Sequence, residues 1–204
     1  MPDVVVGTDG RLRCAWSLSA PEYVGYHDDE WGRPVVDDNR LYEKLCLEGF
    51  QSGLSWLTIL RKRDAFRRAF AGFDPYRVAR FNSRDVGRLL RDAAIVRHRG
   101  KIEATIANAH ATLSVQDDVG SLAALLWSYE PPRRRAPKRL DDLTSTTAES
   151  KALSKELLRR GFRFVGPTTV FSTMQACGIV NDHLARCTAR RSCEEERRAL
   201  IRPK

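Results

Sequence analysis

Apolar residues recur every three or four positions along almost the whole chain, which is the spacing of helices that bury one face. Strand signals are nearly absent, and the only candidates are Val4–Val6 and Arg163–Val165. Ser55, a residue type that favours the position before a helix, precedes one helical stripe. That stripe comprises Trp56, Ile59, Leu60, Arg63, Phe66 and Phe70. The sequence therefore predicts an all-α fold, with one domain or two small lobes in 204 residues.

Residues that start and stop helices mark several boundaries. Asp74–Pro75 predicts a helix start, because aspartate caps the first turn and proline fits its backbone. Ser83 is a candidate cap for the following helix, and Thr146–Glu149 has the spacing of a capping box. Gly161 lies where a helix would end, and Gly166–Pro167 would open the last core helix.

The chain divides into three parts by composition. Residues 1–11 form an N-terminal extension, and residues 12–187 form the main domain. Residues 188–204 are mostly charged, and we expect them to fray or to form an exposed helix. Within the main domain, Pro131–Arg139 predicts a basic loop, because its prolines are incompatible with a regular helix.

Positive charge is concentrated in one part of the chain. Residues 61–101 hold 13 Lys or Arg against 4 Asp or Glu, so this block alone accounts for the net charge of +9. A block of this kind is typical of proteins that bind a polyanion such as nucleic acid. The alternative is a set of solvated helix faces.

Cellular location and cysteine chemistry are also constrained. No apolar run approaches the ~20 residues that span a bilayer, and the start Met1–Val6 lacks the basic segment of a signal peptide. We therefore expect a cytoplasmic protein without membrane contact. In that reducing compartment, cysteines favour metal ligation or simple burial over disulfides. There are five: Cys14, Cys46, Cys177, Cys187 and Cys193.

Four potential metal ligands lie near opposite ends of the chain. Cys14 and His27 are separated by twelve residues, and His183 and Cys187 are four apart, on one face if that stretch is helical. Together they would complete the Cys2His2 set that structural zinc favours. Spacing alone leaves a second interpretation open, in which the two pairs are unrelated and merely buried.

Aromatic side chains form a second group near the N-terminus. The group consists of Trp16, Tyr23, Tyr26, Trp31 and Trp56, with the carboxylates of Glu30 and Glu48 nearby. Aromatic faces with one carboxylate suit a flat, cationic base, which they bind by stacking and cation–π attraction. The alternative is a core shared by the N-terminal helices.

The segment Glu48–Trp56 predicts a tight turn between helices, with glycines at positions 49 and 53. Such a turn could expose Leu54 at its tip, where an apolar side chain can enter a base stack. It could equally be a buried corner between the helices.

Several motifs resemble the 3-methyladenine DNA glycosylase I family, a member of the helix-hairpin-helix DNA glycosylase superfamily. The resemblance extends from about Cys14 to Cys187, about 85% of the chain, in the order and spacing of the family. The segments that carry it are Tyr26–Gly32, Glu48–Trp56, Arg97–Lys101, Arg160–Gly166, Met174–Gly178 and Asn181–His183.

The resemblance implies a helix-hairpin-helix fold with one structural zinc ion per chain, which joins the N- and C-terminal regions. The residues that match the zinc ligands of the family are Cys14, His27, His183 and Cys187. Glu48 matches the carboxylate that hydrogen-bonds 3-methyladenine, and Tyr26 and Trp56 match the residues that stack on the base. Tyr23 and Trp16 match further positions in the lining of the pocket.

The resemblance also implies a DNA surface. Gly53 and Leu54 match the tip that fills the gap left by the extruded nucleotide, and Arg97, Arg99 and Lys101 lie in the phosphate-binding hairpin. Two features depart from the family pattern: Ala94 replaces a frequent glycine near the hairpin, and both ends of the chain are extended. Cys193 lies in the C-terminal extension and matches no ligand.

The implied activity is hydrolysis of the N-glycosidic bond of 3-methyladenine in double-stranded DNA, with Glu48 as the catalytic residue. The resemblance implies no lysine nucleophile and therefore no lyase activity. A zinc-stapled DNA-binding adaptor without catalysis is the alternative, although an adaptor would not need the intact pocket set. A metal-dependent nuclease would need an open metal position, which four protein ligands would close. We expect a monomer.

Overall fold

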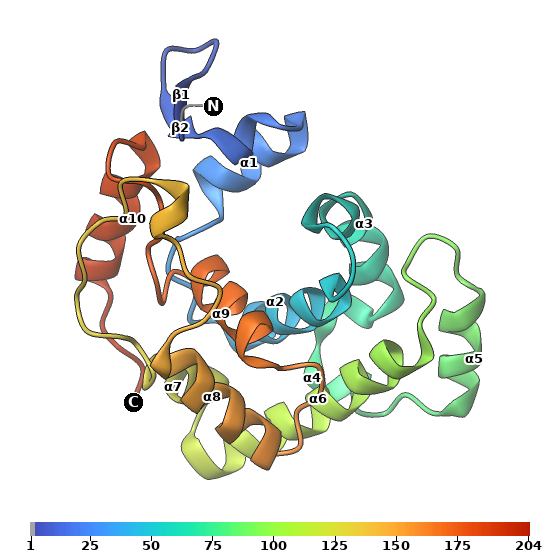
Figure 1. The fold of residues 1–204 in the computed structure, drawn as a ribbon. Helices are drawn as coiled ribbons and strands as arrows, with labels where there is room; N and C mark the ends of the chain where they lie inside the picture. Colours follow the sequence, from blue (N-terminus) through green and yellow to red (C-terminus); the bar gives the residue numbers. More distant parts are fainter. Residues whose placement is uncertain (1–2) are drawn as a thin grey trace.

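The computed structural model describes residues 3–204 and is mostly helical, as the apolar spacing predicts (Figure 1). The longer helices are α1 (Pro21–Asp29), α2 (Asp38–Gln51), α3 (Trp56–Ala69), α5 (Ser83–Arg91), α6 (Arg99–Val119), α8 (Ala148–Arg159), α9 (Pro167–Ala176) and α10 (Thr188–Ala199). The shorter ones are η1 (Ala15–Leu18), η2 (Ala71–Phe73), α4 (Pro75–Val78), α7 (Leu122–Trp127) and η3 (Leu140–Asp142).

The two strand predictions have different outcomes. Val4–Val6 forms strand β1, which pairs antiparallel with β2 (Leu12–Cys14) so that Val4 faces Cys14. The prediction for Arg163–Val165 is wrong, because this segment is the irregular loop between α8 and α9. Met1 and Pro2, the start of the predicted extension, lie outside the described residues.

Helix α2 forms the centre of the core and packs against α9, α3 and α6 (Figure 1). Leu41, Leu45 and Phe50 on α2 are all almost fully buried. Phe50 contacts Phe66 of α3 at a ring separation of 4.5 Å. Burying each such ring stabilises the fold by roughly 1.5–3 kcal/mol, so α2 is a rigid support for any group at its end.

Most of the predicted helix boundaries agree with the structure. The Ser55 hydroxyl accepts from the Thr58 amide at 3.2 Å, and Asp74 caps α4. Gly161 has a φ of +89° just after α8, where the left-handed backbone favours glycine. The cap of α5, however, is Asn82 and not Ser83, because the Asn82 side chain accepts from the backbone of the first turn.

A hairpin of two helices, α5 and α6, is joined by residues 92–98. Lys62 of α3 fixes this connection by donating to the Ala93 and Ala94 carbonyls at 3.2 and 3.1 Å. The Ala94 amide donates to Asp92 at 2.9 Å, and Ala94 is not among the residues with positive φ. Alanine therefore fits this turn without the backbone freedom of glycine.

Segments near the two ends of the chain are in contact, because the β1–β2 hairpin lies near α10 (Figure 1). The predicted C-terminal tail is largely the exposed helix α10, although Ala189 and Cys193 are buried. The basic segment Pro131–Arg139 is irregular, as its prolines predict. Within residues 3–204, no helix is long and apolar enough to cross a membrane.

Candidate functional site

An aromatic cavity of about 360 Å³ opens where α1, α2, α3 and α9 meet. It contains all five side chains predicted for the base pocket: Trp16, Tyr23, Tyr26, Glu48 and Trp56. Trp31, which belongs to the same aromatic group in the sequence, also lines it. Side chains from residue 16 to residue 56 thus line the same cavity, and Glu48 is the acidic residue among them.

Edge-to-face contacts hold one wall of the cavity rigid. The Trp16 ring meets Tyr23 at 5.5 Å and 85°, and it meets Trp31 at 5.2 Å and 82°. On the other side, the Tyr26 and Trp56 rings lie 5.4 Å apart and tilted by 46°. The Trp56 indole N–H is buried without a hydrogen-bond partner, so it can donate to a bound molecule.

Glu48 occupies the last turns of α2 and is only 6% exposed. Burial raises the pKa of its carboxyl to about 8, and the Lys44 ammonium opposes this shift only in part. None of the hydrogen bonds among residues 3–204 involves this carboxylate. A buried acid without a partner is costly, so the cavity is suited to a ligand that brings N–H donors or positive charge.

The sequence prediction missed part of the cavity wall. Ser19 and Gln51 line it, and so do Ser172 and Gln175 of α9. Helix α9 follows α2 by more than a hundred residues, so no local pattern could place it there. Glu30, named with the aromatic group, does not line the cavity, because it forms a salt bridge with Arg63 at 2.6 Å.

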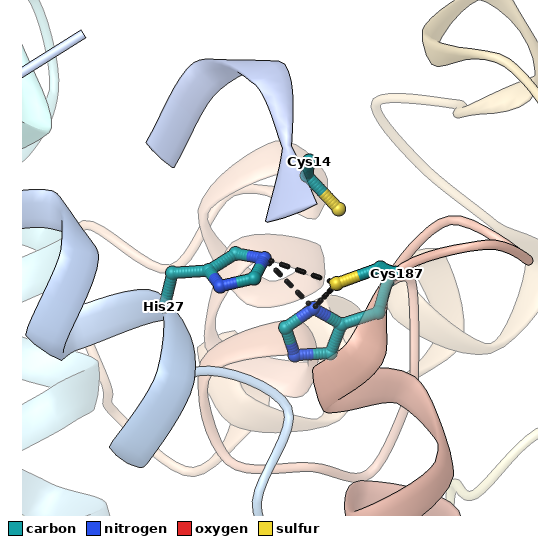
Figure 2. A group of neighbouring side chains, drawn as sticks. Cys14, His27 and Cys187 are labelled. Atoms are coloured by element: carbon teal, nitrogen blue, oxygen red, sulfur yellow. Dashed lines mark hydrogen bonds between the residues drawn. The ribbon is translucent and has the colours of Figure 1, made fainter. Parts of the chain in front are cut away.

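The four predicted metal ligands meet in a second, fully buried cluster. The ligand atoms of Cys14, His27, His183 and Cys187 all lie within 4.8 Å of one another. Figure 2 shows Cys14 and His27 pointing toward Cys187 from separate elements. The stretch from His183 to Cys187 is not helical: both residues lie in the turn before α10, and this turn brings them together in place of a shared helix face.

Hydrogen bonds around this cluster fix which nitrogen of each histidine can hold a proton. His27 Nδ1 lies 2.8 Å from the Asp28 carboxylate, and His183 Nε2 lies 2.9 Å from the Trp31 carbonyl. When both rings are neutral, each therefore carries its proton on the nitrogen that faces away from the cluster, which is Nδ1 in His27 and Nε2 in His183. The inner nitrogens then face each other as lone pairs at 3.1 Å, beside the Cys187 sulfur. This arrangement fits a cation at the centre.

Comparison with known proteins shows the family of the chain. A family model described as methyladenine glycosylase matches residues 16–191. The chain belongs to the methyladenine glycosylase family. It is 47% identical to DNA-3-methyladenine glycosylase 1 of Escherichia coli K12, over 86% of this chain and 95% of that protein. It is 41% identical to DNA-3-methyladenine glycosylase of Haemophilus influenzae, over 88% of this chain and 98% of that protein.

Solved structures in the family have the same fold. A crystal structure of 3-methyladenine DNA glycosylase I superposes with a TM-score of 0.83 at 47% identity, covering 86% of this chain and 98% of that one. A Staphylococcus aureus 3-methyladenine DNA glycosylase I, described for its recognition of 3-methyladenine, gives 0.84 at 38% identity, covering 87% and 96%.

The residues matched by the methyladenine glycosylase family model do not include the N-terminal hairpin. Cys14 and the hairpin precede the first matched residue, Trp16. The hairpin nevertheless supports the ligand cluster through Arg13, which is 4% exposed. The Arg13 guanidinium donates to Asp28 at 2.7 Å and to Asp9 at 2.6 Å. The Asp28 carboxylate, which also contacts the His27 ring, is therefore held in place by Arg13.

The predicted DNA-binding residues fall into three groups. Gly53 has a φ of +78° in the turn after α2, and Leu54 beside it is 42% exposed. Arg97 and Arg99 are exposed at the start of α6. Lys101 is different: it is 7% exposed, and its ammonium donates to the carbonyls of Phe50 at 2.8 Å and Ser52 at 2.5 Å. Lys101 therefore fixes the turn and is no longer a candidate phosphate contact.

The basic block is partly neutralised by neighbouring helices. Arg61 and Arg67 of α3 form salt bridges with Glu22 and Glu43, each at 2.7 Å. A second hollow, of about 330 Å³, lies between the basic loop and α10. It has no aromatic wall, and its arginines are largely paired, as Arg133 is with Glu194 at 3.1 Å. The aromatic cavity is therefore the better candidate for a base.

Proposed function

We propose that this chain is a monofunctional DNA glycosylase that hydrolyses the N-glycosidic bond of 3-methyladenine in double-stranded DNA. The observation that carries the proposal is the buried, unpartnered Glu48 carboxyl inside an aromatic cavity. Relatives at 41–47% identity over most of their length carry the corresponding name. We also propose a monomeric protein that acts in the cytoplasm, where the DNA of the named bacterial relatives lies.

The chemistry of the substrate explains why one acid can suffice. A 3-methylated adenine is positively charged while it is attached to its sugar, so it leaves without protonation by a strong acid. Once the base is extruded, Tyr26 and Trp56 stack on it, and the Glu48 carboxylate accepts from its N–H groups. A cation in the cavity favours the ionised carboxylate and so counters the raised pKa of Glu48. Holding the base and sugar in place for water supplies the remaining rate enhancement.

A direct assay separates this enzyme from a DNA-binding adaptor. Purified protein is incubated with methylated DNA, and the released bases are resolved by chromatography. Release of 3-methyladenine supports the glycosylase, and the same chromatogram shows whether 3-methylguanine is also a substrate. No base release, together with tight binding to the DNA, would favour the adaptor.

The hairpin formed by α5 and α6 supports a helix-hairpin-helix mode of DNA binding. Arg97 and Arg99 would contact phosphates, while Gly53 and Leu54 would fill the gap left by the extruded nucleotide. Lys101 contributes indirectly, because its bonds to the carbonyls of Phe50 and Ser52 hold this tip in place.

The phosphate contacts predict a salt effect. Replacing Arg97 or Arg99 with alanine should weaken binding to abasic DNA and reduce the slope of log affinity against log salt by about one. The loss should be similar for every DNA sequence, since phosphates carry no base information. Fluorescence anisotropy over a range of salt concentrations measures both quantities.

Arg191 supplies the matched control. It pairs with Glu195 four residues later on α10, as Arg99 pairs with Glu103 on α6. Arg191→Ala should leave the slope unchanged. If Arg97→Ala and Arg99→Ala also leave it unchanged, the hairpin does not bind phosphate.

We further propose that Cys14, His27, His183 and Cys187 hold one structural zinc ion. The support is the buried set of two sulfurs and two inner lone pairs within 4.8 Å. A hydrogen bond from the Cys14 thiol, followed by contacts to the two histidines, lowers the pKa of Cys187 against the opposing effect of burial, while the same contact raises the pKa of Cys14. One thiolate, Cys187, is therefore favoured before a cation binds. When bound, the ion would link the two end regions of the chain, and these four residues would leave it no open position for a reaction.

The outer contact to His27 gives a test of the zinc proposal. Asp28→Asn should lower zinc affinity about 10–100-fold, because the amide holds the His27 ring less firmly than a carboxylate does. Competition with a chromogenic chelator measures this affinity without any activity assay. Asp29→Asn is the control, since Asp29 is the exposed neighbour. Equal zinc affinity in the two variants would contradict a role for Asp28.

A further inference from the structure

Phe164 has an unusual combination of backbone and exposure. It lies in the loop between α8 and α9 with a φ of +55°, and it is 39% exposed. A left-handed backbone is uncommon for a large side chain, because its Cβ crowds the following carbonyl. Phe73 has a similar φ of +56°, but its ring is fully buried in the core. Core packing therefore explains Phe73 and leaves Phe164 unexplained.

The surrounding loop is clamped, so the conformation of Phe164 is imposed by its neighbours. The Asn108 amide accepts from the Arg163 N–H at 2.7 Å and donates to the Arg163 carbonyl at 3.1 Å. The Ser154 hydroxyl donates to the Val165 carbonyl at 2.7 Å. Phe162 and Val165 are both 1% exposed and anchor the loop in the core. Phe164 is thus held outward on a rigid support.

Two glycines lie against Phe164, Gly49 against its backbone and Cβ and Gly100 beside its ring. A Cβ at Gly49 would lie 3.3 Å from the Phe164 Cβ and 3.4 Å from its carbonyl oxygen. A Cβ at Gly100 would lie 3.9 Å from the far edge of the ring. The His98 ring meets Phe164 edge-on at 6.2 Å. Gly49 lies inside α2, where glycine destabilises a helix, so the close approach of Phe164 accounts for its presence.

These neighbours place Phe164 beside both the end of α2 that carries Glu48 and the start of α6 in the proposed phosphate-binding hairpin. Gly49 follows Glu48 of the cavity, and His98 caps α6, the second helix of the hairpin. Exposed Arg97 and Arg99 flank His98. A rigid, exposed aromatic ring beside cationic side chains is typical of surfaces that stack on unpaired bases.

Resting on the proposed glycosylase function, we propose that Phe164 is a DNA-binding residue that stacks on a base exposed when the damaged nucleotide leaves the helix. The gap created by extrusion leaves neighbouring bases with a free face. The Phe164 ring offers such a base a flat apolar partner whose orientation is fixed before binding. Phe164 acts on DNA binding and touches no reacting atom.

The test is the affinity of the full chain for a duplex with one abasic site. Phe164→Ala should weaken this affinity about 5–100-fold, the range for losing one base-stacking contact. The slope against salt concentration should stay the same, because the ring displaces no counterion. Phe164→Trp should keep an affinity for the abasic duplex close to that of the parent. Leu158→Ala is the control, because Leu158 is a 54% exposed apolar residue on α8.

Phe164→Leu separates stacking from simple packing. Leucine keeps apolar contact with Gly49 and Gly100 but has no aromatic face, so it should bind as weakly as the alanine variant. If Phe164→Leu, or a folded Phe164→Ala, binds abasic DNA within twofold of the parent, the stacking proposal is wrong. If Phe164→Ala does not fold, the Leu and Trp variants decide. Failure of the parent to release base would instead overturn the proposed function.

Discussion

Glu48→Gln should slow the release of 3-methyladenine from methylated DNA at least tenfold. The substitution keeps the size of the side chain but replaces the carboxylate with an amide, which presents donors where the base needs acceptors. It also removes the negative charge that favours a cationic base in the Tyr26–Trp56 cavity. A tenfold effect corresponds to ~1.4 kcal/mol of transition-state stabilisation. Single-turnover base release on methylated DNA measures it.

Glu43→Gln is the matched control, because Glu43 is also buried on α2 but pairs with Arg67 at 2.7 Å. It should leave excision close to that of the parent. Glu48→Gln should also retain its zinc and its binding to abasic DNA, since neither involves the carboxyl. A folded Glu48→Gln variant that excises as fast as the parent would show that Glu48 does not read the base.

Glu48→Gln should also change how the free energy of unfolding depends on pH. In the folded chain, burial raises the pKa of Glu48 from 4.5 to about 8. Between these values the folded state binds more protons than the unfolded state, so the free energy of unfolding falls as pH rises from about 4.5 to about 8. Glu48→Gln removes this contribution, and its stability relative to the parent should increase over that window. Denaturant unfolding at pH 5 and pH 8 compares the two.

Cys187→Ser should abolish stoichiometric zinc binding and lower the melting temperature by about 10 °C or more. Structural zinc contributes its binding free energy to folding. For a chain of this size, each kcal/mol of lost stability lowers the melting temperature by about 2–4 °C, so a loss of a few kcal/mol gives the expected shift. The parent should contain about one zinc per chain by elemental analysis, and a strong chelator should reproduce the loss of stability. Excision should fall only as folding fails.

Cys193→Ser provides the comparison for this variant. Cys193 is fully buried close to the cluster, and its thiol donates to the Trp31 carbonyl at 3.8 Å, yet it is not one of the four ligands. It should keep its zinc, whatever small stability it loses. A metal-free parent that melts at the same temperature with and without added zinc would overturn the zinc proposal.

Local signals in the sequence predicted most of the helices correctly. The Ser55 cap, the Gly161 stop and the Gly166–Pro167 start depend on a few neighbouring atoms, so short patterns identify them. Arg163–Val165 has strand composition but pairs with no strand in the described part of the chain, and Asn108 and Ser154 bind its backbone instead. These partners are distant in sequence, so the pattern could not reveal them.

The candidate site, like the fold, was predictable only where its residues form a recognisable pattern in the sequence. Cys14 and Cys187 are far apart in sequence, so residue type and spacing made one metal site possible but left two unrelated pairs as an alternative until the structure placed them together. Ser172 and Gln175 of the cavity wall carry no distinctive spacing. Lys101 looks in sequence like any cation of the basic block, because its carbonyl partners become visible only when α2 and α6 are packed.

The buried Cys2His2 cluster has a consequence for the order in which the chain is made. Cys14 and His27 leave the ribosome early, but His183 and Cys187 follow only after more than 150 further residues. The cluster cannot close during most of synthesis, even when α2 and α3 can already pack against each other. In the proposed zinc-bound chain, loading of the ion would therefore come last, after both halves of the ligand set have been translated and have met. Nascent chains that stop before His183 would lack this closure and be exposed to proteolysis.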